Sequence, residues 1–215
     1  SPEISRELCA KAKALAKEMN YRPNPFAMSL RKNAPRIIGV IVPDIVTHFF
    51  ASILNGIENM AIANGYFVII TTSHESYEHE KRNIENLVNM RVEGIIACLS
   101  QETTDFSHIS ALKDINMPLI LFDRVCLTDQ FSSVIADGAQ SAQMATQHLL
   151  DNGSERVAFI GGANHLDIVK RRKHGYLEAL RENRIPIEKE LVVCRKIDYK
   201  EGKIATETLL SLPQP

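Results

Sequence analysis

The chain has 215 residues, of which 45% are hydrophobic and 24% are charged, and its formal net charge is −1. This is the composition of an ordinary globular protein with enough apolar residues for a core. The longest apolar runs, such as 37–43, are too short to span a bilayer. The N-terminus is charged and has no apolar stretch, so we expect no signal peptide. Four scattered cysteines favour reduced, mostly buried thiols in a cytoplasmic protein over a disulfide framework.

The charge is distributed unevenly along the chain. Residues 1–36 hold eight Lys or Arg and three Glu, a net charge of +5, so that the remaining residues carry −6. A basic N-terminal segment on an acidic body indicates a polyanion-binding arm. A solvated basic helix face is the alternative, and the charge alone does not decide between the two.

The first predicted elements are helical. Residues 2–19 carry apolar side chains at spacings of three or four, and Ser1-Pro2-Glu3 is a typical helix start. Pro23 and Pro25 interrupt the helical pattern. A short amphipathic helix is predicted over 26–32, and it is below the length at which an isolated helix is stable in water.

From residue 37 onward, predicted strands and helices alternate. The predicted strands are 37–42, 67–71, 94–99, 119–122, 133–136, 157–160 and 191–195, and the predicted helices are 50–64, 80–90, 107–115, 139–150, 168–180 and 200–210. This order predicts an α/β fold with parallel sheets covered by helices on both faces. We expect two doubly wound subdomains, 36–137 and 138–215, the second incomplete, with a ligand in the cleft between them.

The sequence contains no signature of an enzyme, a metal site or a cofactor site. Gly161-Gly162 lacks the spacing of a dinucleotide-binding loop, and no phosphate loop or nucleophile elbow is present. His74 and His79 are five residues apart without a third ligand at metal spacing. The sequence therefore predicts binding rather than catalysis.

Polar side chains follow the predicted strands at their carboxyl ends. Ser73 follows the second strand, Ser100 the third, and Asp123 and Arg124 the fourth. Carboxylate and guanidinium groups in a cleft can form bidentate hydrogen bonds with sugar hydroxyls or with a carboxylate. We therefore expect these residues to face a ligand.

Two further features suit a ligand-binding site, and each also has a purely structural explanation. Phe49 and Phe50 are adjacent on one helix, so one of them covers the cleft as a stacking platform unless both are packed away. Arg172 lies near the start of the 168–180 helix, where the helix dipole disfavours a cation. Arg172 either contacts a ligand or belongs to an exposed basic turn.

Seven segments, in this order and spacing, resemble the LacI family of transcriptional regulators over essentially the whole chain. The segments are Ser1-Pro2-Glu3-x-x-Arg6, Asn20-Tyr21-Arg22-Pro23-Asn24, Ala27-x-Ser29-Leu30-Arg31, Val42-Pro43-Asp44-Ile45 with Phe49-Phe50, Arg91-Val92-Glu93-Gly94-Ile95-Ile96, Pro118-x-x-x-x-Asp123-Arg124 and Arg172-x-x-Gly175-Tyr176-x-x-Ala179-Leu180. The resemblance implies that 1–19 is the last helix of a helix-turn-helix headpiece and 20–35 a linker with a hinge helix. The subdomains of periplasmic-binding-protein type follow.

The resemblance also implies the DNA contacts. Leu30 is expected to wedge into the minor groove of a palindromic operator, as apolar side chains do in kinked DNA. Alternatively, Leu30 contacts the core domain or the hinge helix of a partner subunit. The other residues expected at DNA are Ala27, Arg31, Lys32, Tyr21 and Arg22.

For the effector site the resemblance implies Phe49, Phe50, Asp123, Arg124 and Arg172, with Ser73 and Ser100 as further candidates. The expected protein is a cytoplasmic homodimer without membrane contact. It binds operator DNA, and a small molecule, expected to be a carbohydrate, controls that binding. A periplasmic-type sugar-binding receptor is the alternative.

Two observations limit what the resemblance implies. Thr47-His48 replaces the usual Asn-Pro before the paired phenylalanines, which leaves the identity of the effector open. The start at Ser1 without Met and the stop after a helical stretch lead us to expect a partial chain.

Overall fold

The computed structural model describes residues 5–19, 21 and 36–213. Its contacts divide the chain into two units, Ser1–Arg36 and Ile37–Pro215. The predicted hinge helix, with Ala27, Leu30, Arg31 and Lys32, lies outside the described residues, as does Arg22.

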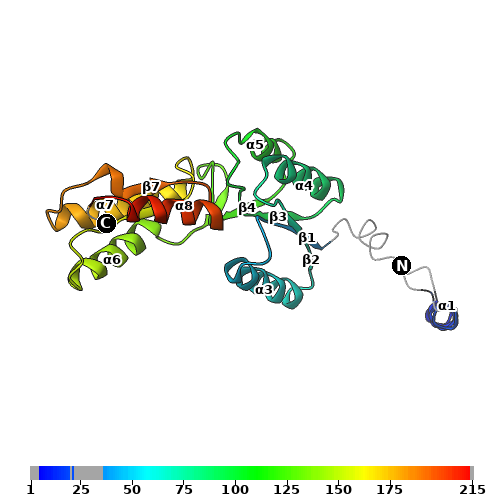
Figure 1. Cartoon of the computed structure of the whole chain (residues 1–215). Coiled ribbons are helices and arrows are strands. Elements are labelled where there is room, and N and C mark those ends of the chain that lie inside the picture. The colour runs from blue at the N-terminus through cyan, green and yellow to red at the C-terminus, as the bar shows by residue number, and fades with distance from the viewer. Residues whose placement is uncertain (1–4, 20, 22–35, 214–215) are drawn as a thin grey trace. The chain divides into compact units, whose positions relative to one another are not determined.

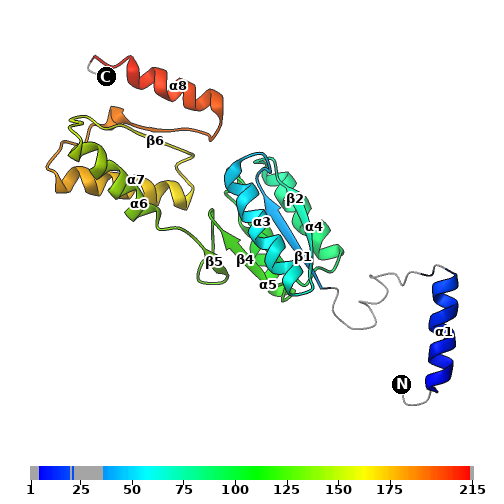
Figure 2. The same cartoon turned by 90° about the horizontal axis from the view of Figure 1, so that it is seen from below.

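The first unit contains helix α1 (Arg6–Glu18) (Figure 2). The side chain of Ser5 accepts a hydrogen bond from the backbone N–H of Leu8 at 3.2 Å and caps the helix. Among the described residues the helix therefore begins at Arg6, and the predicted start at Ser1 lies outside them. Leu8, Leu15 and Tyr21 are exposed within this unit.

The second unit begins with a five-stranded sheet in which every pairing is parallel, in the order β2-β1-β3-β4-β5 (Figure 1). The strands are β1 (Ile37–Val42), β2 (Phe67–Thr72), β3 (Gly94–Ala97), β4 (Leu119–Phe122) and β5 (Ser132–Val134). The interior strand β1 is a continuous apolar run because helices cover both of its faces.

Three helices cover this sheet: α3 (His48–Ala63) on one face, and α4 (Tyr77–Asn89) and α5 (Ser107–Asp114) on the other (Figure 1). Val40 and Val42 belong to the core cluster of α3, whereas Ile41 belongs to the cluster of α4 and α5. Successive residues of β1 thus point to opposite faces, as the pleat of a strand requires.

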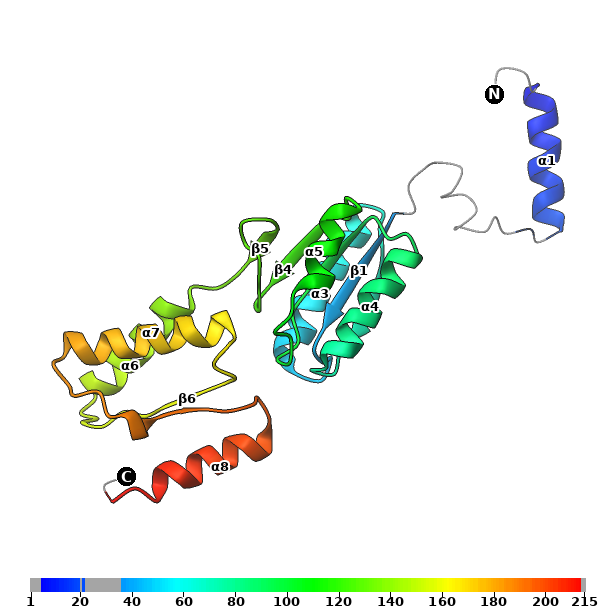
Figure 3. The same cartoon turned by 90° about the horizontal axis from the view of Figure 1, so that it is seen from above.

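A smaller parallel sheet pairs β6 (Phe159–Gly161) with β7 (Val192–Cys194), and a 3-10 turn (Lys189–Leu191) precedes β7. Its helices are α6 (Gly138–Asp151), α7 (Asp167–Glu182) and α8 (Tyr199–Leu210), and α6 lies against α7 (Figure 3). The buried Tyr176 donates its hydroxyl to the carbonyl of Val157 at 2.8 Å.

The predicted α/β class with parallel sheets is confirmed, with one five-stranded sheet and a partial second sheet. β5 ends at Val134 and α6 begins at Gly138. The boundary between subdomains at 137/138 stays a prediction, as do the other predicted domain limits.

The prediction of mostly buried thiols holds for two of the four cysteines. Cys98 and Cys126 are buried, whereas Cys9 is exposed and Cys194 is half-buried. Burial raises the pKa of both buried thiols to about 12, so they stay protonated.

Candidate ligand-binding site

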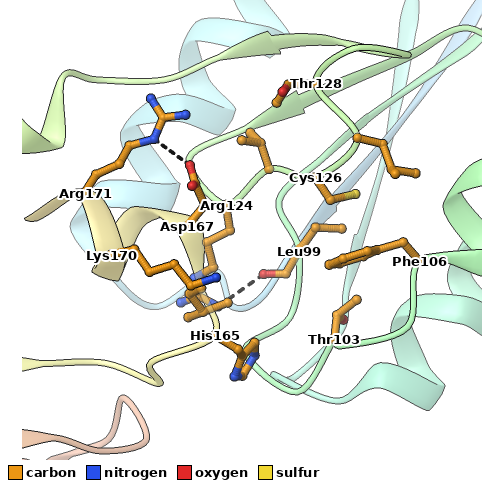
Figure 4. Close-up of a pocket in the computed structure, with 13 residues that line it drawn as sticks. Leu99, Thr103, Phe106, Arg124, Cys126, Thr128, His165, Asp167, Lys170 and Arg171 are labelled. Carbon is orange, nitrogen blue, oxygen red and sulfur yellow. Dashed lines mark hydrogen bonds and ion pairs between the residues drawn. The ribbon is translucent and has the colours of Figure 1, made fainter.

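A pocket of about 260 Å³ lies beyond the carboxyl ends of β3 and β4 (Figure 4). Its walls are the turn after β3, the turn after β4 and the start of α7. The lining residues are Leu99, Thr103, Phe106, Arg124, Val125, Cys126, Leu127, Thr128, His165, Leu166, Asp167, Lys170 and Arg171. The pocket lies just below the range of roughly 300–1,000 Å³ of small-molecule sites, and it is where parallel α/β folds bind ligands.

Arg124 lines this pocket and is held by a carboxylate that the sequence analysis did not single out. Its Nη1 lies 2.6 Å from Oε2 of Glu75 and its Nη2 lies 2.9 Å from Oε1, a bidentate pair. Nη1 also donates to the carbonyl of Leu99 at 3.2 Å. Burial is the largest influence on the pKa of Arg124 and lowers it, but the hydrogen bonds and charge of Glu75, together with Cys98 and Asp123, outweigh burial and raise that pKa.

Asp123 precedes Arg124 in a left-handed conformation, with φ of 58°. Its carboxylate is half-buried and lies 3.9 Å from the Sγ of Cys98. Burial raises the pKa of Asp123, and the charges of Arg124 and Arg172 oppose that shift. Arg172 therefore acts electrostatically on the carboxylate that the sequence analysis placed in the same site.

The two phenylalanines take different environments. Phe50 is 5% exposed and packs in the core with its ring centroid 6.4 Å from that of Phe122. Phe49 is 51% exposed, and its ring centroid lies 5.1 Å from that of Phe50 in an edge-to-face arrangement. Of the pair, Phe49 is the one that is free to contact a ligand.

The two serines after the strands are buried. Ser73 is fully buried, and its hydroxyl has no hydrogen-bond partner among the described residues. The hydroxyl of Ser100 accepts from the N–H of Glu102 at 3.1 Å, and its own N–H donates to the buried Glu80 at 2.5 Å. Ser100 thus shapes the turn after β3.

Helix α7 brings its first two turns to the pocket. Asp167 and Arg171 form an i,i+4 ion pair of 2.5 Å, drawn in Figure 4. Lys170 is exposed and also lines the pocket. Arg172 lies on the same helix but is not among the residues that line this pocket.

Sequence reasoning missed Glu75, Asp167 and Lys170. Glu75 and its neighbour His74 both have positive φ, 59° and 52°, directly after β2. Bulky residues rarely adopt positive φ, so this turn marks Glu75 in the structure. The φ angles are not visible in the sequence, which therefore offered no signal for Glu75.

The described residues hold neither a metal-binding cluster nor a membrane-spanning helix. No group of three or more His, Cys, Asp or Glu among them is arranged to hold a metal ion. No helix within the same residues is long and apolar enough to cross a membrane.

A family profile described as "Periplasmic binding proteins and sugar binding domain of LacI family" matches residues 36–215. The chain belongs to the LacI family. LacI-family membership confirms the resemblance carried by the motifs of the regulatory core, since the match covers the five-stranded sheet, the smaller sheet and the pocket between them.

The relatives are regulators. The chain is 31% identical over 221 residues to the probable HTH-type transcriptional repressor ExuR of Bacillus subtilis (strain 168), covering 100% of this chain and 64% of the relative. It is 29% identical to the solved transcription regulator CcpA of Lactococcus lactis, with a TM-score of 0.76, covering 82% of this chain and 65% of that one.

A second solved structure, the Cra transcriptional dual regulator from Pseudomonas putida in complex with fructose 1-phosphate, is 26% identical with a TM-score of 0.65, covering 75% and 57%. The chain spans 62–64% of the length of the first curated relatives. All three of these proteins are regulators of transcription by name.

Proposed function

We propose that this chain is part of a sequence-specific transcriptional regulator, a repressor, whose affinity for operator DNA is controlled by a sugar bound between its two α/β subdomains. One observation carries the proposal. The family profile starts at residue 36, yet ExuR aligns over the whole chain, including the basic segment before that residue. The segment 1–36 is thus shared with a repressor.

The DNA-binding part of the proposal rests on that segment. Its net charge of +5 suits phosphate neutralisation, which makes DNA affinity fall with salt. Leu30, with Ala27, Arg31 and Lys32, enters the minor groove, and Tyr21 and Arg22 contact the DNA beside it. A homodimer in the cytoplasm matches a palindromic operator by its two-fold symmetry.

The ligand-binding part rests on the pocket beyond β3 and β4. Arg124 lines this pocket. Asp123, Phe49 and Arg172 are not among the lining residues and contact the effector from beside the pocket, while Phe50, Ser73 and Ser100 support the surrounding helix and turns. The Cra structure contains a sugar phosphate, which supports a sugar-like ligand in a fold of this kind. Ligand binding shifts the population of the DNA-binding state. In typical allosteric proteins the coupling free energy between two such binding events is about 1–3 kcal/mol.

The proposal is tested by fluorescence anisotropy of the full-length protein that contains this chain, on the DNA upstream of its own gene. We expect binding that weakens steeply between two salt concentrations, and at least a tenfold loss in Leu30→Ala. Leu149→Ala, the same change at an exposed position of α6, is the control and leaves the affinity unchanged. Absence of DNA binding at low salt, with sugar binding intact, would replace this proposal by the sugar-receptor alternative.

A further inference from the structure

The guanidinium of Arg124 is already occupied by a carboxylate of this chain. Both terminal nitrogens are bonded to Glu75, at 2.6 and 2.9 Å, and the arginine side chain is only 7% exposed. A bidentate contact of this kind is the one that arginine otherwise offers to a phosphate or a carboxylate of a ligand. A ligand anion must therefore displace Glu75 before it can take that place.

Glu75 is fixed in this position by the backbone around it. Its left-handed φ of 59° turns the chain after β2, and its Oε2 accepts a second hydrogen bond, from the N–H of Gln101 at 2.8 Å. The carboxylate is 24% exposed. A charged side chain tied to three donors in a largely buried place is costly to remove, because the arginine left behind would be a buried charge without its partner.

The other strong cation of the pocket wall is also paired. Arg171 is bonded to Asp167, which leaves Lys170, an exposed and flexible point charge, as the remaining Lys or Arg among the residues that line the pocket. Two ion pairs offer donors and acceptors side by side with no net charge. Such a lining suits hydroxyl groups, which both donate and accept hydrogen bonds.

We infer that Glu75 determines the charge class of the ligand: by occupying Arg124, it makes the pocket select an uncharged polyhydroxyl compound over a phosphorylated or carboxylated one. The inference rests on the proposed function and deepens it, since the Cra structure shows that the fold also accommodates a sugar phosphate. Glu75 is thus a specificity-determining residue that acts through Arg124.

The test is isothermal titration calorimetry of the full-length protein with inorganic phosphate, fructose and fructose 1-phosphate. Glu75→Gln keeps the shape of the side chain and frees the charge of Arg124. We expect its affinity for inorganic phosphate to rise at least tenfold, and the affinity ratio of fructose 1-phosphate to fructose to rise by a similar factor if fructose is bound. Glu102→Gln removes the same charge from the exposed pair with Lys196 and is the matched control, expected to behave as wild type.

The double variant Glu75→Gln with Arg124→Met separates the charge effect from a change of shape. It lacks both partners, so its phosphate affinity is expected to return to the wild-type value, and its thermal unfolding shows whether it is folded. The inference is overturned if wild-type protein prefers fructose 1-phosphate to fructose, or if Glu75→Gln and Glu102→Gln bind phosphate equally. These outcomes are independent of DNA binding, whose loss would count against the proposed function instead.

Discussion

The side-chain oxygen of Gln101 accepts a hydrogen bond of 2.8 Å from the backbone N–H of Ile197. Gln101 follows β3 of the large sheet, and Ile197 follows β7 of the small sheet, so one side chain links the carboxyl ends of the two. The N–H of Gln101 in turn donates to Glu75, which holds Arg124. Gln101, which contacts Ile197, is therefore connected through Glu75 to the pocket residue Arg124 by two hydrogen bonds.

Removing this link should loosen the second sheet locally. Gln101→Ala deletes the acceptor of the Ile197 N–H, and a single hydrogen bond contributes about 1 kcal/mol. We expect faster hydrogen exchange at the Ile197 amide, followed by NMR. Glu102→Ala, which removes only an exposed pair of 3.5 Å, is the control. Unchanged exchange at Ile197 would show that the contact is not maintained in solution.

A second prediction concerns the fully buried Glu80. It accepts from the Ser100 N–H at 2.5 Å, from the Thr103 hydroxyl at 2.9 Å and from His108 Nε2 at 2.8 Å, which fixes one wall of the pocket. Glu80→Ala should lower the free energy of unfolding by about 3 kcal/mol, because it leaves buried donors without a partner.

Urea unfolding measures this loss. Glu85→Ala, on the exposed face of the same helix, is the control and should change the free energy of unfolding by less than about 0.5 kcal/mol. Equal effects of the two variants would contradict a structural role for the Glu80 cluster.

Helix packing depends on Gly175. A Cβ at this position would lie 1.9 Å from the carbonyl oxygen of Ala139, which belongs to the backbone of α6 and cannot move aside. Gly175→Ala should therefore destabilise the protein by about 3 kcal/mol in thermal or urea unfolding. Gly56→Ala, in the open middle of α3, is the matched control and should stabilise by up to about 1 kcal/mol. A neutral effect at Gly175 would mean that α6 and α7 do not pack as described.

The buried thiol of Cys98 predicts a dependence of stability on pH. Its pKa is raised to about 12 from an ordinary value of 9.0. Its contribution is fully present below pH 9 and is lost as the pH rises from about 9 to about 12, because the thiol ionises first in the unfolded chain. The loss is at most about 1.4 kcal/mol per pH unit.

Urea unfolding of wild type and Cys98→Ala at pH 8, 9 and 10 isolates this thiol from the other groups that titrate. The wild type should lose more stability between pH 9 and 10 than the variant does. Parallel losses would indicate that the Cys98 thiol is accessible to solvent.

Local patterns predicted most of the fold. The β-branched run at 37–42 and the helical spacing over 168–180 depend only on neighbours in sequence, and the structure places β1 and α7 there. The pair of Glu75 with Arg124 could not be predicted in this way, because its partners are 49 residues apart and meet only through the left-handed turn after β2. The same holds for Gly175, whose small size is required by a helix that starts far away in sequence.

Local patterns also predicted part of the candidate site. Strand ends identified Asp123 and Arg124, since the carboxyl ends of parallel strands meet at one edge. Which of Phe49 and Phe50 is exposed depends on how α3 rotates on the sheet, and two adjacent aromatic positions do not determine that rotation.

A ligand bound at this pocket is expected to change the affinity of the full-length protein for DNA. This coupling is measured as the Kd of the full-length protein for its upstream DNA with and without each of a panel of neutral sugars, in wild type, Arg172→Ala and Arg82→Ala. At least one sugar is expected to change the wild-type Kd by about 5- to 150-fold. Arg172→Ala is expected to lose this response, and Arg82→Ala, exposed on α4, to keep it. A wild-type protein that binds the DNA but responds to no sugar, or a full response in Arg172→Ala, would contradict this coupling.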